Sequence, residues 1–187
     1  MNRRFLFMLI VFLFVPFIAF AAIDEVLSTD YVISYSFENV ASHGVRYESD
    51  LLDGRPGADW SHGIGLAMTM ESPLSEDGFV PVLGTLLTGY KYTSMHFEPL
   101  ELSVLAGPAF LLDLESPGYG MGFAFDAEYY IGSSRVLSFR AGLQAMVGSI
   151  YDSVIQTFRT DEAAWNVAAF TGFTLRFRTY NKEGGNV

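Results

Sequence analysis

The chain of 187 residues contains no cysteine, which excludes both a disulfide framework and a lipid-modified cysteine anchor. Charged residues are also scarce, at 17% of the chain against about 25% in soluble domains. Beyond residue 21 no apolar run approaches the roughly 20 residues that a membrane-spanning helix needs. Hydrophobic residues nevertheless reach 50% and aromatic residues 16%. This combination suggests a membrane protein that does not cross the bilayer with helices.

The first 21 residues have the features of a secretory signal peptide. Arg3 and Arg4 precede an apolar run over residues 5–18, and Ala19-Phe20-Ala21 has the small-x-small pattern of a cleavage site. We predict cleavage after Ala21. An uncleaved membrane helix is the alternative reading, which the alanine site and Pro16 in the apolar run disfavour.

Cleavage at this site leaves a mature domain that we place over residues 22–180, and the strand pattern described below predicts that it is a barrel. Residues 181–187 form a polar C-terminal tail in this prediction. Cleavage removes two arginines and no acid, so the formal charge moves from −10 to −12. A surface this acidic repels phosphate backbones, and we expect no nucleic-acid partner.

Large apolar side chains recur at every second position after the signal. In residues 118–132, Tyr119, Met121 and Phe123 alternate with glycine and alanine. A period of two indicates β-strands, because successive side chains point to opposite faces of a sheet. The pattern predicts eight strands, of which the second is weak: residues 28–38, 45–52, 60–71, 82–92, 100–114, 118–132, 137–151 and 167–177.

Most of these strands have the length that a tilted transmembrane strand requires, about 9–11 residues. The face opposite the large side chains is mostly Gly, Ala, Ser and Thr, which suits the narrow interior of an eight-stranded barrel. We therefore predict an all-β fold, an up-and-down antiparallel transmembrane β-barrel of about eight strands preceded by a cleaved signal peptide. A soluble barrel or sandwich is the alternative, and it needs many more charged side chains facing water.

The small-residue face also carries charges, which need partners inside a barrel. The hairpin through residues 131–135 allows two registers, one placing Glu128 and the other Asp126 opposite Arg140. We expect an acid–arginine network that plugs the lumen, with Lys91 as a further candidate. Its predicted members are Glu101, Asp126, Glu128, Arg140 and Arg176.

Aromatic residues are expected near the strand ends, where outer-membrane barrels carry girdles at both interfaces. Aromatic residues are common in all β-strands, so the girdle prediction depends on their position at strand ends and not on their number. With odd-numbered strands running outward, the predicted girdle on the periplasmic side is Tyr31, Trp60, Tyr90, Tyr92 and Tyr129, and on the other side Tyr151 and Trp165. His62 is then expected to belong to this belt beside Trp60 rather than to bind a metal.

The segment "GFTLRF", residues 172–177, resembles the assembly signal in the last strand of outer-membrane barrels. With the signal peptide and the eight alternating strands, the chain resembles small barrels of the OmpA, OmpX and OmpW type. The resemblance implies outer-membrane lipid and the barrel-assembly machinery as partners, and the cell outer membrane as location. Two features depart from it: Phe170 stands where a polar residue is usual, and residues 181–187 follow the final aromatic.

The preferred function is a structural or surface-interaction role, in which the barrel is an anchor and loops contact an extracellular ligand. The segment 152–164 is the main candidate loop, with Val154, Ile155 and Phe158 as an exposed patch. The alternative is an OmpW-like conduit for small apolar solutes. Its only support is a set of large apolar residues on the inner face: Leu105, Leu111, Met146 and Phe170.

A lipid A-modifying enzyme is the least favoured reading. Such enzymes use histidine with serine and an acid, but the His-x-Ser arrangement of the deacylases is absent at all three histidines. His43 is expected in an external loop. The sequence therefore indicates no enzyme, with no catalytic, cofactor-binding or metal-binding residue.

Overall fold

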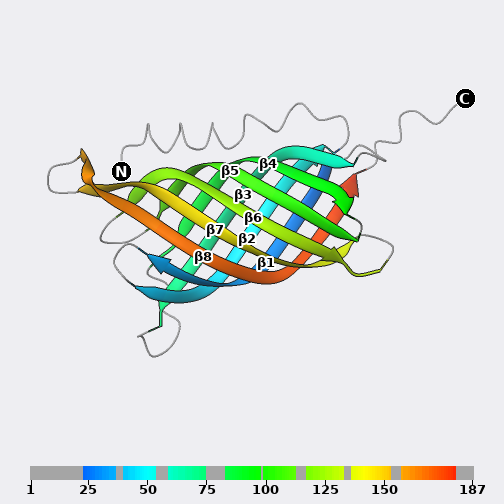
Figure 1. Ribbon diagram of the computed structural model, residues 1–187, viewed down its shortest axis with the longest axis horizontal. Coiled ribbons are helices and arrows are strands. Elements are labelled where there is room, and N and C mark those ends of the chain that lie inside the picture. The colour runs from blue at the N-terminus through cyan, green and yellow to red at the C-terminus, as the bar shows by residue number, and fades with distance from the viewer. Residues whose placement is uncertain are drawn as a thin grey trace, which may run out of the picture.

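The computed structural model describes residues 23–36, 40–53, 59–74, 83–97, 99–112, 117–132, 136–152 and 157–179. In these ranges the chain forms a single antiparallel sheet that closes on itself as a barrel (Figure 1). The strands are β1 (Ile23–Ser36), β2 (Ala41–Asp53), β3 (Trp60–Pro73), β4 (Thr85–Phe97), β5 (Leu100–Leu111), β6 (Gly118–Tyr130), β7 (Leu137–Asp152) and β8 (Thr157–Thr179). The predicted eight-stranded up-and-down β-barrel is confirmed.

The barrel closes where the first strand meets the last. β1 pairs with β8 from Ile23 opposite Thr179 to Ser36 opposite Asn166, and every other strand pairs with its neighbours in the chain. Closure satisfies the backbone groups that a free sheet edge leaves unpaired. The predicted signal peptide, residues 1–21, and the predicted tail, residues 181–187, lie outside the described residues. Within the described part of the chain, no helix is long and apolar enough to cross a membrane.

Side chains alternate between the two faces of the wall as the sequence predicted. In β6, Met121 and Phe123 point outward with 62% and 53% of their surface exposed, whereas Gly122 and Ala124, the residues that follow them, are buried. The inner face carries small residues because eight strands enclose little space. The wall at β6 is thus apolar outside and small or polar inside.

The second strand is longer than predicted. β2 has 13 residues and pairs along its length with β1 and β3, so the expectation of a short, weak strand over residues 45–52 is wrong. His43 lies inside β2 opposite Ile33 of β1, and its predicted place in an external loop is wrong too. Outward-facing His43 and Ser49 interrupt the apolar pattern, and this interruption concealed the strand.

The predicted loop over residues 152–164 is mostly a strand. Asp152 pairs with Thr157 and Tyr151 with Phe158, so β7 and β8 continue as a two-stranded hairpin. Among the described residues, β1 pairs with β8 only from Asn166 onward, and the earlier part of β8 pairs with β7. Residues 153–156, and the side chain of Phe158, lie outside what the structure describes.

Candidate functional site in the barrel lumen

The predicted charged residues all lie on the inner face of the barrel. Glu128 faces Arg140 across the β6–β7 pair, which is the first of the two registers considered. The ion pair nevertheless forms diagonally, because Arg140 Nη2 lies 3.3 Å from Asp126 Oδ2. Glu128 instead accepts a hydrogen bond of 2.9 Å from the hydroxyl of Ser138.

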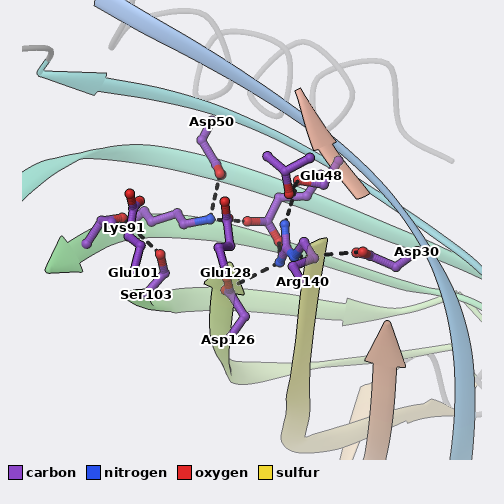
Figure 2. A network of polar contacts seen from close by, with 12 residues as sticks. Asp30, Glu48, Asp50, Lys91, Glu101, Ser103, Asp126, Glu128 and Arg140 are labelled. Atoms are coloured by element: carbon purple, nitrogen blue, oxygen red, sulfur yellow. Dashed lines mark hydrogen bonds and ion pairs between the residues drawn. The ribbon is translucent and has the colours of Figure 1, made fainter. Parts of the chain in front are cut away.

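Arg140 is the centre of a network that crosses the lumen (Figure 2). Its Nη2 atom lies 3.1 Å from Glu48 Oε2, and its Nε atom lies 3.7 Å from Asp30 Oδ1. Its Nη1 atom donates a 2.6 Å hydrogen bond to Ser28. The guanidinium and the carboxylates around it are shielded from solvent, with less than 4% of each residue exposed. Arg140 of β7 thereby holds side chains of β1, β2 and β6 together.

Arg46 and Lys91 continue this network. Arg46 Nη1 lies 3.0 Å from Asp30 Oδ2, and Arg46 Nη2 donates to Glu48. Lys91 Nζ donates to Glu48 and lies 2.6 Å from Asp50 Oδ2. Glu48 therefore accepts from three buried cations, which is the compensation that a carboxylate in a low-dielectric interior needs.

A second ion pair joins β5 to β8. Arg176 Nη2 lies 2.5 Å from Glu101 Oε1, and the hydroxyl of Tyr130 donates to the other oxygen of Glu101 at 2.5 Å. The Arg176 guanidinium also lies 5.5 Å from the centre of the Tyr130 ring. β5 and β8 are not neighbours in the wall, so this pair too spans the lumen.

Four members of the network were missed from the sequence: Asp30, Arg46, Glu48 and Asp50. Arg46, Glu48 and Asp50 stand at every second position of β2, opposite the outward Val45, Tyr47 and Leu51. Alternation of charge with apolar residues was thus the available signal. It was masked because a run of polar residues such as "RYESD" resembles a loop.

Phe170 packs against the charged network rather than facing an open channel. The guanidinium carbons of Arg46 and Arg140 lie 4.1 and 5.0 Å from its ring centre, which is cation–π geometry. Gly142 makes room for the ring, because a Cβ atom there would lie 2.5 Å from Phe170 Cζ. The aromatic residue that departs from the usual last-strand pattern therefore has a specific place in this lumen.

The other large inward residues pack inside the lumen, and Leu105 lies opposite Lys91 of the charge network. Leu105, Leu111 and Met146 are at most 2% exposed. They belong with Phe170 to one buried apolar cluster, whose further members are Val32, Ala67, Leu83, Leu87, Ala109, Ala124, Ile150, Ala164 and Ala168. Apolar packing and charge pairing thus each occupy a part of the interior.

The predicted girdle residues with described side chains are half-exposed or exposed on the outer wall. Trp60 stacks on His62 with 5.3 Å between ring centres, and Trp60 and Tyr92 are 6.4 Å apart. His62 also stacks on Tyr90. Nε2 of His62 lies 4.0 Å from Asp53 Oδ2. These rings form one aromatic patch.

The remaining girdle residues are more scattered. Tyr129 lies near the end of β6, but Tyr31 lies near the middle of β1, because that strand begins at Ile23 rather than at residue 28. Trp165 contacts Tyr35 with 5.8 Å between ring centres. The side chain of Tyr151 lies outside the described residues. The placement of Tyr31 at a strand end is therefore wrong.

Among the described residues, no group of three or more His, Cys, Asp or Glu side chains is arranged to hold a metal ion. Cations and carboxylates from different strands pair with one another in the lumen, where the described buried acids outnumber the described buried bases. These pairs join residues of β1, β2, β4, β6 and β7, and of β5 and β8.

The fold is similar to two known structures. Neisserial surface protein A (NspA) shares 11% sequence identity over 83% of this chain and 97% of that chain, with a TM-score of 0.49. A structure from the de novo design of transmembrane β-barrels shares 14% identity over 81% and 95% of the two chains, with a TM-score of 0.43. No protein-family profile and no curated protein sequence matches the chain. The resemblance to the OmpA, OmpX and OmpW type stays a prediction.

Proposed function

We propose that this protein is an integral outer-membrane β-barrel with a closed lumen, which serves as a structural or surface-interaction protein. The observation that carries the proposal is the polarity of the wall: buried charges lie inside, and apolar side chains are exposed outside. A soluble barrel has the opposite requirement, because its outer face must be well hydrated.

The outer face supports placement in lipid. Among the described outward side chains of the strands, only Glu25 and Asp53 are acidic, and none is lysine or arginine. Asp53 is the last residue of β2 and Glu25 lies near the start of β1, so both are close to the end of the barrel where β1 begins and β8 ends. The rest of the wall offers an uncharged band of the kind that faces hydrocarbon.

The interior supports a closed lumen rather than a conduit. A path for small apolar solutes requires inward apolar residues with room beside them. Leu105 and Leu111 are instead packed within the apolar cluster and at most 1% exposed, and the charge network crosses the rest of the interior. In this proposal these residues fill space and do not line a pore.

The hairpin of β7 and β8 is the proposed contact element for an extracellular ligand. β7 continues to Asp152 and β8 begins at Thr157, in a part of the sheet that β1 does not border. Rigid scaffolds commonly present binding residues on such connections.

An epitope tag inserted at residues 153–156 should bind antibody on intact cells. Binding only after permeabilisation would contradict this orientation.

Two measurements test the proposed function. The detergent-extracted protein should come from the outer-membrane fraction and run as a folded band that shifts on boiling. In planar bilayers it should show no large ohmic conductance. Absence from the outer-membrane fraction would refute the membrane assignment, whereas a large conductance would refute only the closed lumen.

The proposal includes no enzymatic activity. His62 stacks within the aromatic patch, and His43 lies 6.2 Å from Tyr31 between ring centres. Mass spectrometry of lipid A from cells with and without the protein should give the same profile. A lost or added acyl chain would overturn this part of the proposal.

A further inference from the structure

Buried acids outnumber buried bases in the lumen. Within the described residues, the buried basic side chains are Arg46, Lys91, Arg140 and Arg176. The buried acidic side chains are Asp30, Glu48, Asp50, Glu71, Glu101, Asp126 and Glu128. Buried carboxylates are costly unless a positive charge compensates them. The surplus of acids raises the question of what neutralises those that the four bases do not reach.

Glu71 is an acid that none of these four bases contacts. It is fully buried on β3, and its neighbours are hydroxyl and amide groups of Ser34, Thr69 and Asn166, with no basic side chain of the described part among them. The Ser34 hydroxyl donates to Glu71 Oε2. Glu71 Oε1 has no hydrogen-bond partner among the described residues. Glu71 Oε1 and the side-chain amide of Asn166 therefore lie beside each other, both without a hydrogen-bond partner within 3.5 Å among the described residues.

Further buried oxygen atoms gather at the same place. Asn166 and Ser42 are at most 1% exposed, and neither the amide oxygen of Asn166 nor the hydroxyl of Ser42 has a hydrogen-bond partner in the described part of the chain. In the sheet, Ser34 pairs with Ser42 and Ser36 pairs with Asn166. These residues come from four consecutive strands of the wall: β8, β1, β2 and β3.

A close approach of two strands lies beside this cluster, and approaches of the same kind recur along the wall at Gly63, Gly89 and Gly120. Gly44 lies opposite Glu71 in the β2–β3 pair, and a Cβ atom there would lie 2.0 Å from the carbonyl oxygen of Met70. Only glycine allows this close approach of the two strands. Ser34, Ser42 and Glu71 also lie within two residues of the ends of their strands. The cluster is thus at the mouth of the barrel opposite the chain termini, near the aqueous phase.

We propose that Glu71, Ser34, Ser42 and Asn166 form a binding site for one monovalent metal cation, Na⁺ or K⁺. The donors are all oxygen atoms, which suit hard cations. One carboxylate balances one positive charge, whereas Ca²⁺ sites usually draw on several carboxylates. The cation compensates Glu71, which has no basic neighbour among the described residues.

Thermal unfolding of the folded protein in detergent micelles tests this site. The unfolding midpoint is measured in NaCl, in KCl and in choline chloride at equal ionic strength. Urea is added to all three samples to bring the midpoint into the measurable range. Choline is too large for a four-oxygen site. With Na⁺ or K⁺ at about ten times its dissociation constant, the midpoint should exceed that in choline by about 3–6 °C. Glu71→Gln should abolish the difference, and Asn166→Ala should reduce it.

The matched control is Glu25→Gln, which removes an exposed acid of the outer face and should keep the wild-type response. Equal wild-type midpoints in the three salts would overturn the site. A salt response that persists in Glu71→Gln would also overturn it. Asn166→Ala provides the test if Glu71→Gln does not fold. None of these outcomes bears on membrane insertion, which the shift of the folded band on boiling reports separately.

Discussion

Arg140 of β7 and Glu48 of β2 meet across the lumen, with 3.1 Å between Nη2 and Oε2, although β8 and β1 separate their strands in the wall. Removing one partner leaves the other charge buried and uncompensated. Arg140→Ala should therefore lower the free energy of unfolding by about 3–5 kcal/mol. Urea unfolding of the protein in micelles measures this change.

The double mutant Arg140→Ala/Glu48→Gln separates this pair from general damage. A direct interaction predicts a coupling energy of about 1–3 kcal/mol in the mutant cycle. Additive effects of the two substitutions would show that the residues act independently, and would contradict the network that crosses the lumen.

Phe170 should matter more than an outward phenylalanine of the same strand. Phe170→Leu removes a ring that lies 4.1 Å from one buried guanidinium and 5.0 Å from another, at a cost of about 2 kcal/mol. Phe173→Leu is the matched control, because Phe173 is 56% exposed on the outer wall, and it should cost less than about 1 kcal/mol. Equal losses of stability would argue against a structural role for the two cation–π contacts.

The sequence predicted the wall better than the interior. β6 alternates without a break, because its outer face is apolar throughout while small or polar residues stand between, and its residues were assigned correctly. β2 was underestimated, because its inner face carries Arg46, Glu48 and Asp50 while Ser49 interrupts the outer one. A strand with polar residues on both faces cannot be distinguished from a loop by periodicity alone.

Contacts across the lumen lie beyond what periodicity can predict. Hairpin geometry brought Glu128 and Arg140 together in one of two registers, because their strands are neighbours in the chain. The pairing of Arg176 with Glu101 joins β8 to β5 and depends on how the closed barrel positions opposite walls. The role of Phe170 likewise depends on guanidinium groups from β2 and β7, and the sequence showed only that a polar residue was missing there.

A charge on the outer wall should be tolerated at the end of a strand but not in its middle. Phe123→Arg places a cation in the central part of β6 and should cost about 2–4 kcal/mol. Tyr129→Arg lies on the same face near the end of that strand and should cost about 0–1 kcal/mol. Unfolding in lipid vesicles measures both values. Similar costs at the two positions would show that depth in a bilayer does not govern this face.

The central claim is a wall with lipid outside and a closed lumen inside, and the absence of cysteine allows a direct measurement of it. Single cysteines at Phe123, facing outward, and at Ala124, facing inward, can be compared in vesicles. A fluorophore on the Phe123→Cys protein should be quenched by brominated lipid, and the Ala124→Cys protein should resist a water-soluble maleimide until it is unfolded. Two results would contradict the account. One is a label on Phe123→Cys that aqueous quenchers reach and brominated lipid does not. The other is rapid labelling of Ala124→Cys in the folded protein.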